Sequence, residues 1–190
     1  MSEQPGRYQR SASGMVGAML VTLLAILAFV ALRACNRTDL EVKPDHVDYL
    51  AQVGYAQGSG AADLVYPASL PSGWYVTSVD FAPGTRPTLG LSMLTAANEY
   101  AGFRQSPLPA AQLLTTYVDE HPTAGAPVTL DSGIVRHWDT WTDSGGDTAL
   151  VARWHRETLM VFGSASQADL ETLAGSLTDA ALPTPAAGSS

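Results

Sequence analysis

The chain has 190 residues, with 18 acidic against 10 basic side chains, a net charge of −8 and one cysteine. A single cysteine excludes a scaffold held by disulfides within the chain. The acidic balance excludes a protein that binds nucleic acid through bulk positive charge. With 46% hydrophobic and 15% charged residues, the chain is too apolar to be disordered throughout.

The charge is divided unevenly along the chain. The first 33 residues hold three arginines and one acid, whereas residues 34–190 hold 17 acids and seven bases. Within the first part, residues 15–32 (MVGAMLVTLLAILAFVAL) form an uncharged, apolar run. As a helix this run would extend for about 27 Å, close to the thickness of a bilayer core. We therefore predict a transmembrane helix over residues 15–34, with the lipid bilayer as its partner.

Two other interpretations of this run stay open. A cleaved signal peptide has an apolar segment of about 7–15 residues, which is shorter, and no Ala-x-Ala cleavage site follows here. A lipoprotein would carry its lipid on Cys35. Ala34 suits that signal, but Arg33 does not.

The orientation of the predicted span depends on the charges of its flanks and on the length of its N-terminal tail. Arg7 and Arg10 precede it and Arg33 and Arg37 follow it, so the positive-inside rule is nearly balanced. The short tail, residues 1–14, favours a cytoplasmic N-terminus. The C-terminal part would then lie outside the plasma membrane.

Residues 35–62 are expected to form a stalk that contains a short helix. Asp45, after Pro44, would be its N-cap, and the flexible run QGSG at residues 57–60 would end it. Its apolar side chains fall on one face: Val47, Leu50, Ala51 and Tyr55.

Residues 63–181 are predicted to be the folded domain, followed by a disordered tail over residues 182–190. Ser106, followed by Pro107, and Ser166 are N-cap residues of two helices. Strands, a helix, strands and a helix in this order predict an α+β domain, an antiparallel sheet with both helices on one face. Alternation and apolar runs predict strands over residues 75–81, 88–95, 99–105, 127–131, 134–142, 148–156 and 158–162.

The hairpin over residues 136–156 holds the densest cluster of polar and aromatic side chains. A turn centred on Gly145 would place His137 opposite Arg153. His137, Asp139 and His155 could then hold zinc, or the face could be solvated, with Asp139 paired to Arg153. The nearby arginines would repel a metal ion, and we expect no metal or other cofactor. The candidate surface comprises His137, Asp139, Trp141, Arg153 and His155.

A second candidate is the turn that precedes the last predicted helix. Gly163, Ser164 and Ser166 lie between a strand and a helix, where free amides could hold an anion. Capping of the helix is the simpler role. The chain has no G-x-S-x-G elbow, P-loop or dinucleotide motif, so catalytic residues are not expected.

Several turn and packing motifs together carry a resemblance that covers roughly residues 12–180. They are Tyr66-Pro67, Leu70-Pro71-x-Gly73-Trp74, the strand Gly102 to Gln105, and Phe162 to Ser166 followed by Asp169-Leu170, Leu173-Ala174 and Leu177. The chain resembles the actinobacterial family catalogued as domain of unknown function 4245. That resemblance implies a single-pass membrane protein with an exported domain. More loosely, the layout is similar to PsbP-like domains, an analogy of fold alone.

These observations lead to one expected function and one alternative. We expect a non-enzymatic binding module of the cell envelope, with a protein or another envelope component as its partner and no nucleic acid. The alternative is an envelope-associated hydrolase or metal-assisted enzyme that uses the hairpin over residues 136–156.

Overall fold

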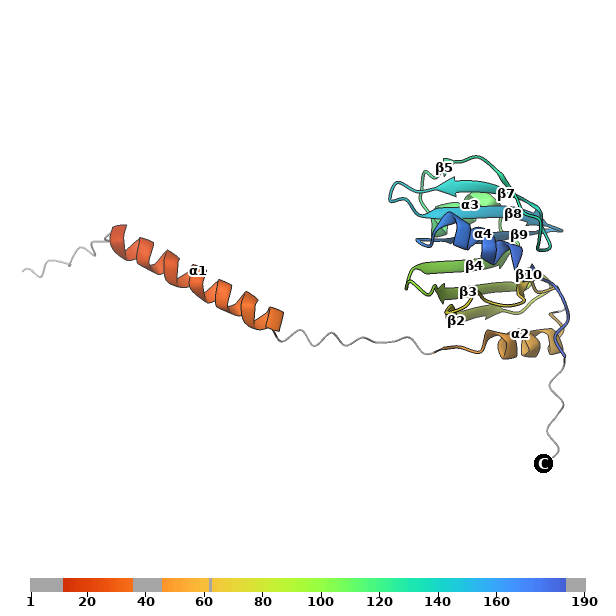
Figure 1. Ribbon diagram of the computed structural model, residues 1–190, viewed down its shortest axis with the longest axis horizontal. Coiled ribbons are helices and arrows are strands. Elements are labelled where there is room, and N and C mark those ends of the chain that lie inside the picture. The colour runs from red at the N-terminus through yellow and green to blue at the C-terminus, as the bar shows by residue number, and fades with distance from the viewer. Residues whose placement is uncertain (1–11, 36–45, 62, 184–190) are drawn as a thin grey trace, which may run out of the picture. The chain divides into compact units, whose positions relative to one another are not determined.

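The computed structural model describes residues 12–35, 46–61 and 63–183 (Figure 1). The chain divides into two compact units, Met1–Lys43 and Pro44–Ser190. The predicted cytoplasmic tail falls outside the described residues up to residue 11, as does part of the predicted stalk, residues 36–45.

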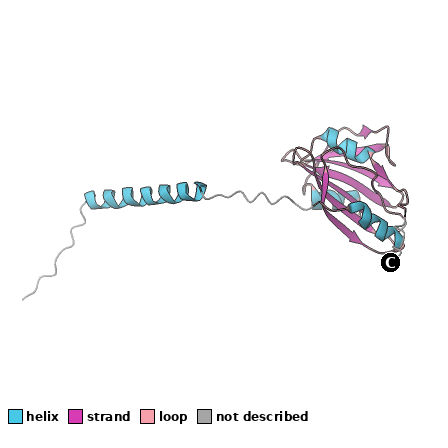
Figure 2. Ribbon diagram, turned by 60° about the horizontal axis from the view of Figure 1, so that its bottom comes forward, coloured by secondary structure: helices cyan, strands magenta, loops and turns pink. Residues whose placement is uncertain are grey.

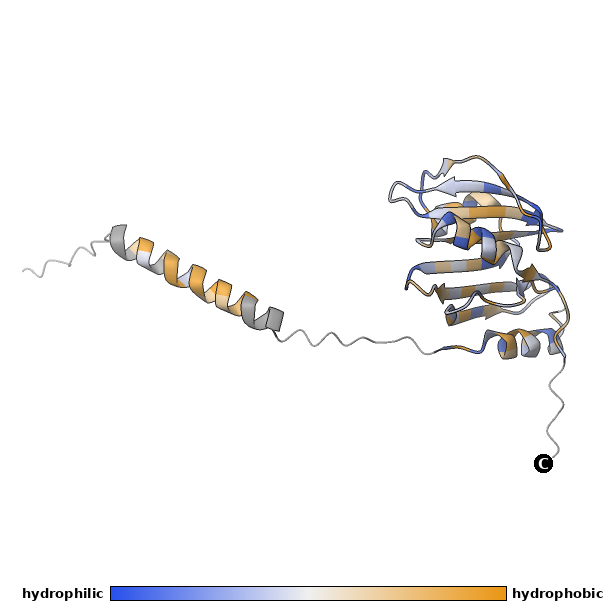
Figure 3. Cartoon of the chain, viewed as in Figure 1, coloured by the Kyte–Doolittle hydropathy of each residue, from blue (hydrophilic) through white to orange (hydrophobic). Residues whose placement is uncertain are grey.

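The described residues of the first unit form the helix α1, which runs from Ala12 to Cys35. Its described side chains, those of residues 15–17 and 19–30, are all exposed. Figure 3 shows that most of them are apolar. Among the residues that the structure describes, no helix has both the length and the apolar character needed to cross a membrane.

The second unit is built on an antiparallel sheet (Figure 2), which confirms the predicted α+β class. The strands lie in the order β2-β3-β4-β9-β8-β7-β5, and β6 pairs with β7. A separate two-stranded sheet pairs β1 with β10. The strands are β1 Tyr66–Pro67, β2 Tyr75–Ala82, β3 Thr88–Leu94, β4 Tyr100–Ser106, β5 Thr123–Ala124, β6 Val128–Thr129, β7 His137–Thr142, β8 Thr148–Trp154, β9 Glu157–Gly163 and β10 Leu177–Thr178.

Helices cover both faces of this sheet, so the prediction of both helices on one face is wrong. Leu159 and Val161 pack in the main core with α2 (Tyr49–Gly58) and α4 (Gln167–Gly175). Met160 and Phe162 point the other way and pack with α3 (Ala110–Tyr117). Every residue of β9 is buried, and a strand that is apolar on both sides needs cover on both faces.

A bulge in β2 explains why the predicted alternation of this strand fails. The pairing with β3 shifts between Val76 and Ser78, so Thr77 is the extra residue. Val76, Val79 and Phe81 therefore all contact the main core, although strict alternation would place Val76 on the opposite side from the other two.

Two of the predicted helix starts differ in the structure, and the third is as expected. The N-cap of α3 is Pro109, because the hydroxyl of Ser106 accepts a bond from Leu108 N within the preceding turn. Asp48, and not Asp45, caps α2 by accepting from Ala51 N at 3.1 Å. Ser166 caps α4 as predicted.

The helix expected in the stalk belongs to the folded unit. Val47 N donates to Val76 O at 2.9 Å, which fastens the start of α2 to β2. Gln57 donates to Ala180 O at 3.2 Å and accepts from Leu182 N at 2.9 Å. The chain near Leu182, where the predicted tail begins, is therefore held by α2, and residues 184–190 of that tail lie outside the described part.

Candidate functional site

Two hollows adjoin at the turn between β8 and β9, because Trp154 and His155 line both of them. The first, here called the cleft, has a volume of about 530 Å³. The second, here called the basic groove, is shallower and has about 540 Å³. The charged residues that line the cleft are Asp63, Arg86, Arg156, Glu157 and Asp179. The groove is lined by Ile134, Val135, Arg136, His137 and Arg153, together with the two shared residues.

The turn itself holds a residue in a costly conformation. Trp154 pairs with Glu157 across the hairpin, which leaves His155 and Arg156 as the two turn residues. His155 has a φ of 50°, a region that glycine or asparagine normally occupies in two-residue hairpin loops. For a residue with a Cβ this costs about 1–2 kcal/mol. The imidazole packs edge-on against the Trp154 indole, with 4.5 Å between the ring centroids.

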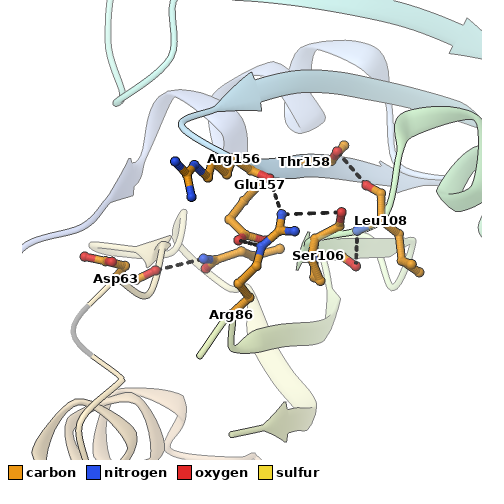
Figure 4. Close-up of polar contacts among 9 residues, drawn as sticks. Asp63, Arg86, Ser106, Leu108, Arg156, Glu157 and Thr158 are labelled. Atoms are coloured by element: carbon orange, nitrogen blue, oxygen red, sulfur yellow. Dashed lines mark hydrogen bonds and ion pairs between the residues drawn. The ribbon is translucent and has the colours of Figure 1, made fainter. Parts of the chain in front are cut away.

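The floor of the cleft is an ion pair between Arg86 and Glu157. Arg86 Nε donates to Glu157 Oε1 at 2.9 Å, and Arg86 Nη2 donates to the carbonyls of Arg156 and Pro107 (Figure 4). The side chain of Glu157 is 9% exposed and that of Arg86 is 44% exposed. Glu157 Oε2 is buried and has no hydrogen-bond partner among the described residues. The arginine therefore compensates a carboxylate that would otherwise be costly to bury.

Gln105 fixes a second wall of the cleft. Its side chain is 1% exposed, and both ends of its amide are bonded. Oε1 accepts from Val65 N and Nε2 donates to Asp63 O, each at 2.8 Å. These two bonds hold the segment before β1 against β4, and Figure 4 shows the one that Asp63 accepts. A buried amide with both ends satisfied supports structure without a net cost.

The basic groove brings together three of the residues predicted from the hairpin: His137, Arg153 and His155. Asp139 pairs with Val151, the register expected for a turn centred on Gly145. Extended by two residues, this register places His137 opposite Arg153. His137 Nδ1 lies 3.1 Å from the hydroxyl of Thr129 on β6, which fixes the ring and leaves Nε2 to other partners.

The other two predicted residues lie elsewhere. Trp141 packs with the α3 cluster, and Asp139 is exposed and lines neither hollow. Both Asp139 and Arg153 are described, and no ion pair joins them. His155 belongs to the turn and not to β8. The described part of the chain holds no group of three His, Cys, Asp or Glu side chains placed to bind a metal ion.

The turn at Gly163, Ser164 and Ser166 is occupied by contacts of the protein itself. Ser164 Oγ accepts from Tyr100 N at 3.1 Å, which ties the turn to β4. Ser166 Oγ accepts from Asp169 N at 3.2 Å and donates to Asp169 Oδ2 at 2.6 Å. A Cβ at Gly163, whose φ is 141°, would collide with Tyr100 O. An anion at this turn would be repelled by the Asp169 carboxylate.

Comparison with protein-family models places almost the whole chain in one family. Residues 7–177 match the model described as protein of unknown function, DUF4245. The chain belongs to this family. Comparison with curated proteins and with solved structures gave no match. Membership of the DUF4245 family assigns no activity to the chain.

Sequence reasoning missed the residues that build the cleft. Arg86 and Glu157 are 71 positions apart, so no local pattern connects them. One signal was present: Glu157 begins the otherwise apolar run ETLMVFG, and an acid in a buried strand needs a cationic partner. Five arginines occur in residues 44–190, which leaves few candidates for that partner.

Proposed function

We propose that this DUF4245 protein is a non-enzymatic binding module of the cell envelope, anchored in the plasma membrane through α1. Its N-terminus would be cytoplasmic and the unit Pro44–Ser190 extracytoplasmic. The ligand would be an envelope component or an envelope protein, held at the hollows beside the β8–β9 turn. Two hollows that share a strained turn support this site, because strain of this kind gathers at functional positions.

The observation that carries the anchor is the surface of α1. Its large apolar side chains between Met15 and Val30 are 56–73% exposed. Apolar surface on this scale is unfavourable in water. The uncharged run of the sequence continues past these described side chains through Ala31 and Leu32, to 18 residues. A helix of this composition satisfies its own backbone hydrogen bonds, as a lipid environment requires.

The test is protease accessibility of the full chain in intact spheroplasts. Our proposal predicts that external protease digests or releases the unit Pro44–Ser190, while the chain stays in the membrane fraction after an alkaline wash. Protection of that unit in intact spheroplasts, with digestion only after lysis, would refute the orientation. Recovery of the unprocessed chain in the wash would refute the anchor.

A matched pair of variants tests the role of α1 itself. Ile26→Arg places a charge near the centre of the apolar run, where an arginine costs about 2.5–3.5 kcal/mol in a membrane helix. We expect a clear loss of membrane retention. Tyr55→Arg is the control, because Tyr55 is a large exposed residue on α2 (77%), outside α1. Equal retention of the two variants would contradict the anchor.

A further inference from the structure

The positive charge of the second unit is concentrated around the two hollows. Residues 44–190 hold 15 acids and five arginines. Four of these arginines, all except Arg104, line the cleft or the basic groove. The described residues that line the groove include two arginines, two histidines and no acid. A patch of this sign on an acidic unit selects for an anionic partner.

We propose that the basic groove binds the phosphate group of an organic ligand. This inference rests on the binding part of the proposed function and is independent of the membrane anchor. The donors come from four side chains: Arg136, His137, Arg153 and His155. A guanidinium presents five N–H donors in a planar fork. This supply suits the three or four oxygens of a phosphate better than the two of a carboxylate.

The described acids near the groove do not occupy the N–H donors of its arginines. Arg136 Nη2 lies 3.5 Å from Asp131 Oδ1, but their side chains are 65% and 102% exposed. An ion pair as exposed as this contributes little, so a phosphate can compete for the guanidinium. Arg153 and Asp139, both described, make no ion pair. The positive end of the groove is therefore available to a ligand.

The remaining lining residues show why the phosphate would be attached to an organic group. Ile134, Val135 and Trp154 give the groove an apolar side. Trp154 is half-buried and packs against the main core, so its ring is held in place. Apolar walls beside a few polar groups are typical of sites for small organic ligands. The expected ligand is therefore a phosphate ester, whose organic group lies beside these apolar side chains.

The experiment is a calorimetric titration of the full chain in a zwitterionic detergent with inorganic phosphate and then glycerol phosphate, at constant ionic strength. Saturable binding is expected, with an equal concentration of chloride giving none. Arg136→Gln and Arg153→Gln should each weaken binding by about tenfold or more, since a hydrogen bond to a charged group is worth that much. Arg104→Gln removes the same charge on β4, outside both hollows, and should leave the affinity unchanged.

A second arm distinguishes a lipid headgroup from a soluble phosphate ester. The full chain is reconstituted into vesicles of phosphatidylcholine, with or without one fifth phosphatidylglycerol. Loss of glycerol phosphate binding only with the anionic lipid assigns the groove to a headgroup. Equal binding in both vesicles assigns it to a soluble ester. Absence of saturable binding, or equal weakening by the Arg153 and Arg104 substitutions, would overturn the proposal. Failure of the membrane anchor would instead be detected in the spheroplast experiment, as recovery of the unprocessed chain in the alkaline wash.

Discussion

The cleft and the basic groove share a wall formed by Trp154 and His155. They differ in how their arginines are paired with acids of the protein. In the cleft, Arg86 donates from Nε to the buried carboxylate of Glu157 and from Nη2 to two backbone carbonyls, so both of these groups are bonded within the fold. In the groove, Arg153 makes no ion pair with the described acids, and Arg136 has only a solvated one. Charge that a protein compensates internally supports its stability, whereas uncompensated charge on a concave surface is available for recognition.

Removal of Arg86 should give the largest effect on stability. Arg86→Gln leaves the Glu157 carboxylate buried without its counter-charge. We expect a loss of about 2–3 kcal/mol, below the 3–5 kcal/mol of a fully buried pair because Arg86 is partly exposed. Urea unfolding of the full chain in detergent measures it. The comparison is Arg104→Gln, whose partner Asp80 is 74% exposed, so this substitution leaves no buried carboxylate without a counter-charge and should cost less than Arg86→Gln.

The double variant Arg86→Gln and Glu157→Gln sharpens this prediction. Neutralising the buried acid removes the penalty that the first substitution exposes, so much of the lost stability should return. Additive losses from the two substitutions would show that burial of the Glu157 charge is not the cause.

A smaller effect, and of opposite sign, is expected at the wall that the two hollows share. His155→Gly relieves the strained φ of 50° at this position. The variant should gain about 0.5–1 kcal/mol in stability, while phosphate binding weakens because one donor is lost. Melting temperature and calorimetry measure the two effects. A variant that is less stable than the parent would show that the histidine ring contributes more through packing than its backbone conformation costs.

The smallest effect concerns a carboxylate outside both hollows. Backbone N–H groups of His121 and Ser144 donate to Asp119 and hold the pKa of this carboxyl below its ordinary value of 3.8. A lowered pKa in the folded state stabilises the fold above that ordinary value, and the benefit is lost as the pH falls through the lower one. Asp119→Asn should thus be slightly less stable than the parent at pH 7 and equal to it at strongly acidic pH. Melting temperatures of the parent and the variant, measured at both pH values, test this. The same difference between the two proteins at both pH values would contradict the prediction.

Local signals in the sequence predicted the features that depend on neighbours in the chain. A turn centred on Gly145 predicted the register of the β7–β8 hairpin, and Ser166 marked the start of α4. The side of the sheet that α3 covers could not be predicted, because Leu159 and Met160 are equally apolar and point to opposite faces. The bulge at Thr77 has no signal in the residues around it.

The residues of the candidate site likewise divide into those that could be predicted from nearby positions in the chain and those that could not. His137, Arg153 and His155 were predicted because they lie on one hairpin, where strand periodicity relates them. The Arg86–Glu157 pair was missed because its partners come from separate parts of the chain. Asp139 was expected to pair with Arg153, but exposed ion pairs gain little over hydration, and alternation alone does not supply one.

The most direct test of the contrast between the two hollows compares Arg86→Gln with Arg153→Gln in the full chain, measuring both unfolding free energy and glycerol phosphate affinity. We predict that Arg86→Gln lowers stability by about 2–3 kcal/mol. We predict that Arg153→Gln changes stability by less than about 0.5 kcal/mol and weakens phosphate binding about tenfold. An Arg153→Gln variant that loses stability but retains its phosphate affinity would contradict the assignment of the groove to recognition.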